Sequence, residues 1–149
     1  MDKALKGTRR KLYLAAPLFS DAELNFNHHL KKVLTPYFDI YLPQEDGELM
    51  VDLIEQGMVP ILAAQRIFSE DIDALKKSDI FLIVLDGRSV DEGAAFELGF
   101  AFALGKECFG LKTDIRSLLQ TGNNPMIDVA MSLIFKTVDE LITWARIVK

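Results

Sequence analysis

The sequence contains only one cysteine and two histidines among its 149 residues. A single thiol, Cys108, excludes an intramolecular disulfide and a zinc site built on cysteines, and it favours a reducing compartment. We expect Cys108 to be buried as a small hydrophobic residue. His28 and His29 are adjacent and cannot share one face of a helix, so we expect two solvent-exposed side chains and no metal site.

Motifs that bind phosphate groups or activate a serine are also missing. The segment 15–19, which follows the first apolar run, contains no Gly-x-Gly-x-x-Gly, and this excludes a dinucleotide fingerprint. The sequence has neither a Gly-x-x-x-x-Gly-Lys-Ser/Thr loop nor a Gly-x-Ser-x-Gly elbow. No cofactor is therefore expected. Seventeen Lys and Arg against 22 Asp and Glu give a net charge of −5, which argues against a nucleic-acid partner.

Long hydrophobic runs are absent as well. Four basic residues between positions 6 and 11 precede the apolar stretch 12–19, but Pro17 interrupts that stretch and acidic residues follow it at once. No other segment approaches the roughly 20 apolar residues that a membrane span requires. We expect a basic tail over residues 1–10, a single domain over residues 11–149, no membrane partner and a cytoplasmic location.

Apolar runs and helical stripes alternate along the chain. Compact apolar runs predict strands at residues 11–16, 38–42, 80–85, 108–111 and 133–135. Apolar residues at helical spacing predict helices at residues 20–36, 49–57, 61–77, 91–104 and 138–148. This alternation predicts an α/β fold of the flavodoxin-like or Rossmann-like type, a sandwich with a mostly parallel five-stranded sheet and helices on both faces. Ligands of such sheets bind beyond the carboxyl ends of the strands.

Local signals mark the ends of two of these helices. Ser20 and Glu23 have the spacing of a capping box, which predicts a helix start at this point. Ser69 can cap a new turn, so the helix over 61–77 is a candidate for a break there.

One acidic residue interrupts the apolar helix over 91–104. From Gly93 to Gly105, every residue except Glu97 is apolar or glycine. A helix that is apolar on all sides is predicted to be buried, which places the Glu97 carboxyl group in hydrophobic surroundings. An unpaired buried carboxylate costs several kcal/mol, so a functional role is favoured over pairing with backbone donors or an arginine.

Two further acids, Asp91 and Asp71, are candidates for the same site. Asp91 comes after the strongest predicted strand, where it can also serve as a helix N-cap. Asp71 lies near a predicted helix start, where a favourable interaction with the helix dipole is the simpler reading. Several acids at one edge favour acid–base and carboxylate-nucleophile chemistry, as in the cleavage of a sugar–heteroatom bond. Binding of Mg²⁺ by carboxylates is the competing interpretation.

A series of short segments also follows the order and spacing of one enzyme family. They are Lys11-Leu12-Tyr13-Leu14-Ala15-Ala16-Pro17-Leu18-Phe19, Leu42-Pro43-Gln44-Glu45-Asp46, Ile67-Phe68-Ser69-Glu70-Asp71, Ser78-Asp79, Asp91-x-Gly-x-x-x-Glu97-x-Gly-x-Ala, Thr113-Asp114-Ile115-Arg116 and Asn124-Pro125-Met126. With these segments the chain resembles the nucleoside 2-deoxyribosyltransferase family across nearly its whole length. The resemblance implies a ping-pong exchange of 2-deoxyribose between purine or pyrimidine bases, with nucleosides and free nucleobases as substrates. It also implies that Glu97 attacks C1′, forms a covalent deoxyribosyl intermediate and gives overall retention of configuration.

The same resemblance implies roles for three residues around the nucleophile and the base. Tyr13 matches the tyrosine that orients the nucleophile, although a core tyrosine is the plain structural reading. Asp71 matches the acid that exchanges a proton with the base. Gln44 matches an amide that contacts the base, and its donor and acceptor suit a nucleobase edge.

Further roles implied by the resemblance concern the sugar and the walls of the site. Phe19 forms part of the wall around the base, with core packing as the alternative. Asp91 and Asn124 hold the sugar 5′-hydroxyl, and Asp71 and Asp91 could exchange their roles. In the family this asparagine comes from a neighbouring subunit, which implies a homo-oligomer, either a hexamer built as a trimer of dimers or a smaller assembly.

Related activities remain as alternatives. Related N-glycosidases of deoxynucleoside 5′-monophosphates carry a serine at the position of Asp91, and a carboxylate there repels a phosphate and favours a free nucleoside. Some family members end near a tyrosine that touches the nucleophile, whereas this sequence ends Trp144-Ala145-Arg146-Ile147-Val148-Lys149. Either Tyr13 is sufficient to position the nucleophile, or its positioning differs and hydrolysis is faster relative to transfer. A hydrolase with the same intermediate is therefore the first alternative, and a non-catalytic nucleotide- or sugar-binding module is the second.

Overall fold

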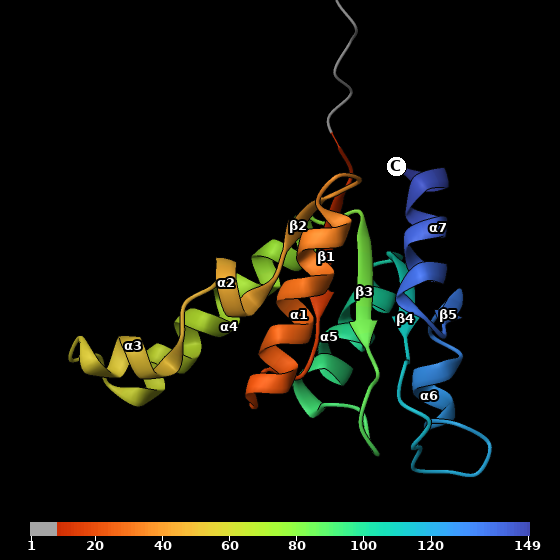
Figure 1. Ribbon diagram of the computed structural model, residues 1–149. Coiled ribbons are helices and arrows are strands. Elements are labelled where there is room, and N and C mark those ends of the chain that lie inside the picture. The colour runs from red at the N-terminus through yellow and green to blue at the C-terminus, as the bar shows by residue number, and fades with distance from the viewer. Residues whose placement is uncertain (1–8) are drawn as a thin grey trace, which may run out of the picture.

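A five-stranded parallel sheet forms the centre of the computed structural model, which describes residues 9–149 (Figure 1). The strands are β1 (Lys11–Ala15), β2 (Asp39–Tyr41), β3 (Ile80–Val84), β4 (Glu107–Leu111) and β5 (Leu133–Phe135). Their order in the sheet is β2-β1-β3-β4-β5, and every neighbouring pair is parallel. This is the flavodoxin-like order of a doubly wound sheet, so the predicted α/β fold class is confirmed.

Seven helices connect and cover these strands within residues 9–149. They are α1 (Asp21–Leu34), α2 (Pro43–Asp46), α3 (Met50–Glu55), α4 (Pro60–Lys77), α5 (Glu92–Ala103), α6 (Pro125–Asp128) and α7 (Val138–Val148). The short helices α2 and α6 are not predicted by periodicity, because four residues are too few to show a helical stripe. The break predicted near Ser69 is wrong, since α4 runs without interruption and Ser69 is exposed inside it.

The two faces of the sheet are covered by different helices. Leu12 and Leu14 of β1 point into a core beneath α1 and α7, where Trp144 packs on Phe109 with ring centroids 4.5 Å apart. The alternate residues of β1, Tyr13 and Ala15, point into a second core beneath α4 and α5. Figure 1 shows α3 and the adjoining part of α4 extending away from the sheet. The period of two along β1 therefore directs Tyr13 to the face on which α5 carries Glu97.

The prediction that α5 is buried on all sides is wrong. Ala94, Leu98 and Ala101 are buried against the sheet, but the opposite face of the helix has no cover within the described chain. Phe96 is 55% exposed and Phe102 is 59% exposed. The helix therefore presents a large apolar surface that its own subunit does not bury.

The remaining expectations about the chain concern its termini and its isolated polar residues. Cys108 is buried as predicted, and His28 and His29 are both exposed. Residues 1–8 of the predicted basic tail lie outside the described residues, and Arg10 pairs with Glu107 at the start of β4. In the part of the chain from residue 9 onward, no helix combines the length and the apolar character needed to cross a membrane.

The predicted capping box of α1 is present and gives a stability test. The Ser20 side chain accepts a hydrogen bond from the Glu23 backbone N–H at 3.3 Å, and the Glu23 carboxylate accepts one from the Ser20 backbone N–H at 2.8 Å. Replacing Ser20 with alanine removes the first bond, so we expect the free energy of unfolding to fall by about 1 kcal/mol in urea denaturation. Ser20→Asp retains an acceptor and serves as the control. An equal loss in both variants would contradict a capping role of the side chain.

Candidate active site

A hydrogen bond joins the nucleophile predicted from the sequence to the central region of the sheet. The Tyr13 hydroxyl donates to Glu97 Oε1 at 2.7 Å. Tyr13 is fully buried in β1, and its ring lies between those of Tyr41 and Phe81, with centroid distances of 5.4 and 5.8 Å. Burial and the nearby Glu97 carboxylate raise the pKa of Tyr13 far above its ordinary range, so the hydroxyl keeps its proton and acts as a donor.

Glu97 lies in the second turn of α5 and is an unusually weak acid. Its pKa is raised from 4.5 to about 7, chiefly by burial, while the hydrogen bond from Tyr13 opposes this shift. The nearby carboxyl groups of Asp71 and Asp91 contribute to the same rise. Among residues 9–149, neither an arginine nor a backbone N–H pairs with the Glu97 side chain. The two structural explanations for a buried acid at this position, pairing with an arginine or with backbone donors, are therefore not found. Both protonation states of Glu97 are accessible near neutral pH.

A second tyrosine holds a second acid in the same region. The Tyr41 hydroxyl donates to Asp71 Oδ1 at 3.0 Å. Burial raises the pKa of Asp71, the Tyr41 bond lowers it, and the charge of Glu70 raises it again. Because α4 is unbroken, Asp71 lies well inside the helix, and the interpretation of this residue as a helix-start acid is wrong.

Asp71 and Glu97 line one cavity. Its volume is about 420 Å³, within the range of small-molecule sites, and its walls come from α3, α4 and α5. The lining residues are Met50, Ala64, Ile67, Phe68, Asp71, Ile72, Gly93, Phe96 and Glu97. No lysine or arginine lines the cavity in the described part of the chain. A carboxyl group that can attack and another that can carry a proton thus face a common apolar space.

Asp91 and Gln44 are held by bonds to nearby backbone or side chains. Asp91 Oδ2 accepts a hydrogen bond from Ala94 N at 2.8 Å, so the residue is the N-cap of α5, as one of the two sequence interpretations predicts. The side-chain amide of Gln44 donates to Leu24 O at 3.0 Å and accepts from Asn27 Nδ2 at 2.8 Å. Both polar atoms of Gln44 are therefore bonded to α1, outside the 420 Å³ cavity.

Phe19 and Asn124 also lie outside this cavity. Phe19 follows β1 and is 79% exposed. Asn124 is exposed and caps α6 by accepting a bond from Met126 N at 2.9 Å, next to a separate space of about 270 Å³. One chain therefore brings together Tyr13, Asp71 and Glu97, with Asp91 at the start of α5, and leaves Phe19, Gln44 and Asn124 apart.

Tyr41 is the residue of this arrangement that the sequence interpretation missed. The signal for it is register: Tyr41 pairs with Tyr13 across β1 and β2, so both rings project to the same face.

Potential metal ligands are not clustered in the same way. Within residues 9–149, no group of three or more His, Cys, Asp or Glu side chains has a geometry that could hold a metal ion.

Known structures share this architecture. A conserved protein from Enterococcus faecalis V583 matches with a TM-score of 0.78 and 23% identity, over 93% of this chain and 98% of that chain. A 2-deoxyribosyltransferase from Bacillus psychrosaccharolyticus matches with a TM-score of 0.72 and 24% identity, over 89% and 90% of the two chains. A CMP N-glycosidase from Clostridium botulinum matches with a TM-score of 0.58 and 17% identity, over 93% and 98%. These similarities establish the fold.

Sequence comparison identifies the family. No curated protein sequence gives a significant match. The family model of nucleoside 2-deoxyribosyltransferase, in contrast, matches residues 12–136, a segment that runs from β1 past β5 and includes Tyr13, Asp71 and Glu97. The chain therefore belongs to the nucleoside 2-deoxyribosyltransferase family.

Proposed function

We propose that the protein exchanges 2-deoxyribose between nucleobases through a covalent deoxyribosyl ester on Glu97. The observation that carries this proposal is the Glu97 carboxyl group, which is partly buried, accepts a hydrogen bond from Tyr13 and faces the same apolar cavity as Asp71. A desolvated carboxylate is a stronger nucleophile than a hydrated one, and a dry cavity protects the ester from water. The family match and the fold similarity to a 2-deoxyribosyltransferase agree with this reaction class.

The proposed reaction has two displacements at C1′. Ionised Glu97 attacks C1′, the C1′–N bond breaks with its electrons going to the base, and Asp71 donates a proton to the departing base. An incoming base then loses a proton to Asp71 and attacks C1′, which releases the Glu97 carboxylate. Two inversions give retention of configuration. Tyr13 orients the nucleophile through the 2.7 Å bond.

The surroundings of Glu97 favour nucleosides over nucleotides as substrates. Asp91 is close enough to raise the pKa of Glu97, and no basic side chain lines the cavity within residues 9–149. A phosphate dianion would meet carboxylates there without a cation to pair with. Hydrolysis of a nucleoside or a 5′-monophosphate through the same ester is the alternative. The fold similarity to a CMP N-glycosidase is the reason to test it.

The proposal also includes the residues outside the cavity. Asn124, Gln44 and Phe19 are proposed to complete the sugar and base sites, Asn124 from a neighbouring copy in a homo-oligomer. The support is the uncovered apolar surface on α3, α4 and α5, where the half-exposed rings of Phe68 and Phe96 lie 6.0 Å apart at the cavity wall. Exposed apolar surface of this extent is typical of an interface between subunits.

Product analysis tests the reaction directly. We expect deoxyadenosine to form when the protein is incubated with adenine and deoxyinosine or deoxycytidine, because Glu97 can transfer the sugar to a second base. We expect Glu97→Ala to abolish the product, a loss of at least about 1,000-fold for removal of a nucleophile. Chromatography of the mixtures measures both. Free base without deoxyadenosine, from these donors or from deoxycytidine 5′-monophosphate, would instead establish the hydrolase.

The raised pKa of Glu97 predicts a pH-dependent cost to stability. Between pH 4.5 and about 7 the folded protein holds the Glu97 proton while the unfolded chain has lost it, so this group makes folding less favourable as pH rises. Glu97→Gln keeps an acceptor for Tyr13 and cannot ionise. Chemical denaturation measures the free energy of unfolding of the variant and the wild type. We expect the difference in favour of the variant to be about 3 kcal/mol larger at pH 8 than at pH 4. An equal difference at both pH values would contradict burial of an ionisable Glu97.

Sedimentation velocity tests the proposed oligomer. Phe102 is exposed on α5 and does not line the cavity, so Phe102→Glu introduces a charge at the proposed interface without touching the site. We expect this substitution to shift the protein toward the monomer, because a charge buried between subunits is costly. Ile147→Glu, on the exposed side of α7, is the matched control and should leave the mass unchanged. A monomeric wild-type protein would refute this part of the proposal.

A further inference from the structure

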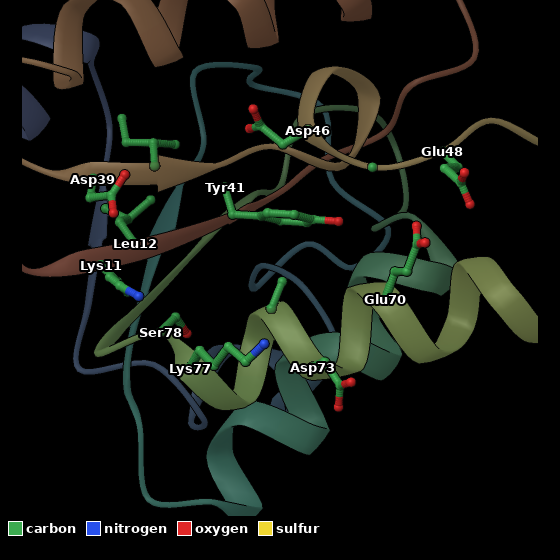
Figure 2. Close-up of a pocket in the computed structure, with 13 residues that line it drawn as sticks. Lys11, Leu12, Asp39, Tyr41, Asp46, Glu48, Glu70, Asp73, Lys77 and Ser78 are labelled. Carbon is green, nitrogen blue, oxygen red and sulfur yellow. The ribbon is translucent and has the colours of Figure 1, made fainter.

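Tyr41 lies between the 420 Å³ cavity, which it reaches through Asp71, and a second, larger groove. This groove, of about 670 Å³, runs between β2 and α4, and Tyr41 lines it while its hydroxyl reaches Asp71 (Figure 2). Figure 2 shows that the groove around Tyr41 is lined by charged side chains, the carboxylates of Asp39, Asp46, Glu48, Glu70 and Asp73 and the amines of Lys11 and Lys77. Tyr41 does not line the cavity that holds Glu97. The residue therefore contacts Asp71 from behind, on the side away from the proposed substrate.

The position of Tyr41 is fixed by two contacts. Its ring stacks on Tyr13 with a centroid distance of 5.4 Å and an interplanar angle of 24°, and the two residues are direct partners across β1 and β2. Its hydroxyl donates to Asp71 at 3.0 Å, while the Tyr13 hydroxyl donates to Glu97 at 2.7 Å. Two stacked tyrosines on neighbouring strands thus each hold one of the two acids.

Gly47 closes this arrangement from a third side. A Cβ at position 47 would lie 2.8 Å from Pro43 O, 3.0 Å from the Tyr41 hydroxyl and 3.4 Å from Asp71 Oδ1. The φ angle of Gly47 is −96°, which any residue can adopt, so the backbone conformation does not require glycine. The requirement is space, because a side chain here would clash with Pro43 O and crowd the hydroxyl that holds Asp71.

We propose that Tyr41, with the space left by Gly47, is a positioning residue that holds the Asp71 carboxyl group in a fixed orientation relative to Glu97. The proposal rests on the function of Asp71 as the proton-transferring acid. The stacked rings belong to residues that are paired across β1 and β2. The distance between the two acids therefore depends on the pairing of these strands and not on flexible side chains alone. A rigid spacing matters because an acid that is displaced by an ångström loses much of its catalytic effect.

The hydrogen bond from Tyr41 also affects the pH range in which Asp71 is protonated. The groups that face Asp71 are Glu70 from its own helix, Glu97 from α5, Tyr13 from β1 and Tyr41 from β2. Of the causes that act on Asp71, burial and the charge of Glu70 raise its pKa, and the Tyr41 bond lowers it. Loss of that bond must therefore raise the pKa of Asp71 and keep the acid protonated to a higher pH.

Tyr41→Phe removes the hydroxyl and retains the stacked ring. We expect the pKa of Asp71 to rise in this variant when its carboxyl carbon is titrated by ¹³C NMR, with Asp71→Asn used to assign the signal. In base exchange we expect kcat to fall on the order of tenfold with little change in KM, because Tyr41 does not touch the cavity. The limb of the pH profile that reports the ionisation of Asp71 should move to higher pH, because the reaction requires protonated Asp71. Tyr37→Phe, whose hydroxyl accepts from Arg146 Nε on the opposite face, is the control.

Gly47→Ala gives a second test, in a variant that keeps the Tyr41 hydroxyl group but crowds it. The added methyl group should displace this hydroxyl and reproduce the fall in kcat and the higher pKa of Asp71. An unchanged pKa in Tyr41→Phe, an unchanged kcat, or a rise in KM alone would each overturn the positioning role. The NMR titration needs no substrate, so it tests the bond even if the wild-type protein transfers no deoxyribose, a result that would refute the proposed function instead.

Discussion

The partial burial of an ionisable carboxyl group, that of Glu97, against the Tyr13 hydroxyl is the constraint on which the rest of the structure depends. Glu97 can lie at this place only if α5 packs closely on the sheet, and Ala94 and Ala101 permit that approach because their side chains are small. Tyr13 must in turn project from the middle of β1 toward α5, which the register with β3 fixes. The position of one oxygen atom of Glu97 therefore follows from the packing of a whole helix layer.

The two faces of the sheet divide stability and chemistry between them. Beneath α1 and α7 the core consists of aliphatic and aromatic side chains, with Trp144 in contact with three other rings. Beneath α4 and α5 the core includes two tyrosines, and Glu97 and Asp71 lie against it with pKa values raised by burial. Acids that resist ionisation make folding less favourable near neutral pH. The apolar face offsets this cost, since its burial does not depend on pH.

The sequence predicts those parts of the molecule that short segments determine. The capping box at Ser20, the strand Leu133–Phe135 and the capping position of Asp91 each depend on a few neighbouring residues, and all three are found. The continuity of α4 past Ser69 and the exposure of Phe102 depend on what packs against each helix, which periodicity cannot show. Likewise, the bond between Tyr41 and Asp71 joins residues 30 positions apart, so no spacing rule reveals it.

The cavity in a single chain has the chemistry of the proposed reaction but not all of its walls. Glu97 and Asp71 face it from inside, whereas Phe68 and Phe96 at its edge are half exposed. An ester that must survive until a second base arrives requires the exclusion of water, which exposed rings alone do not achieve. A second copy packed on α4 and α5 would cover these rings and bring new polar groups to the mouth of the cavity. In the proposed oligomer, subunit association and protection of the ester are therefore the same event, and mutations at the interface should alter the ratio of hydrolysis to transfer before they alter the attack by Glu97.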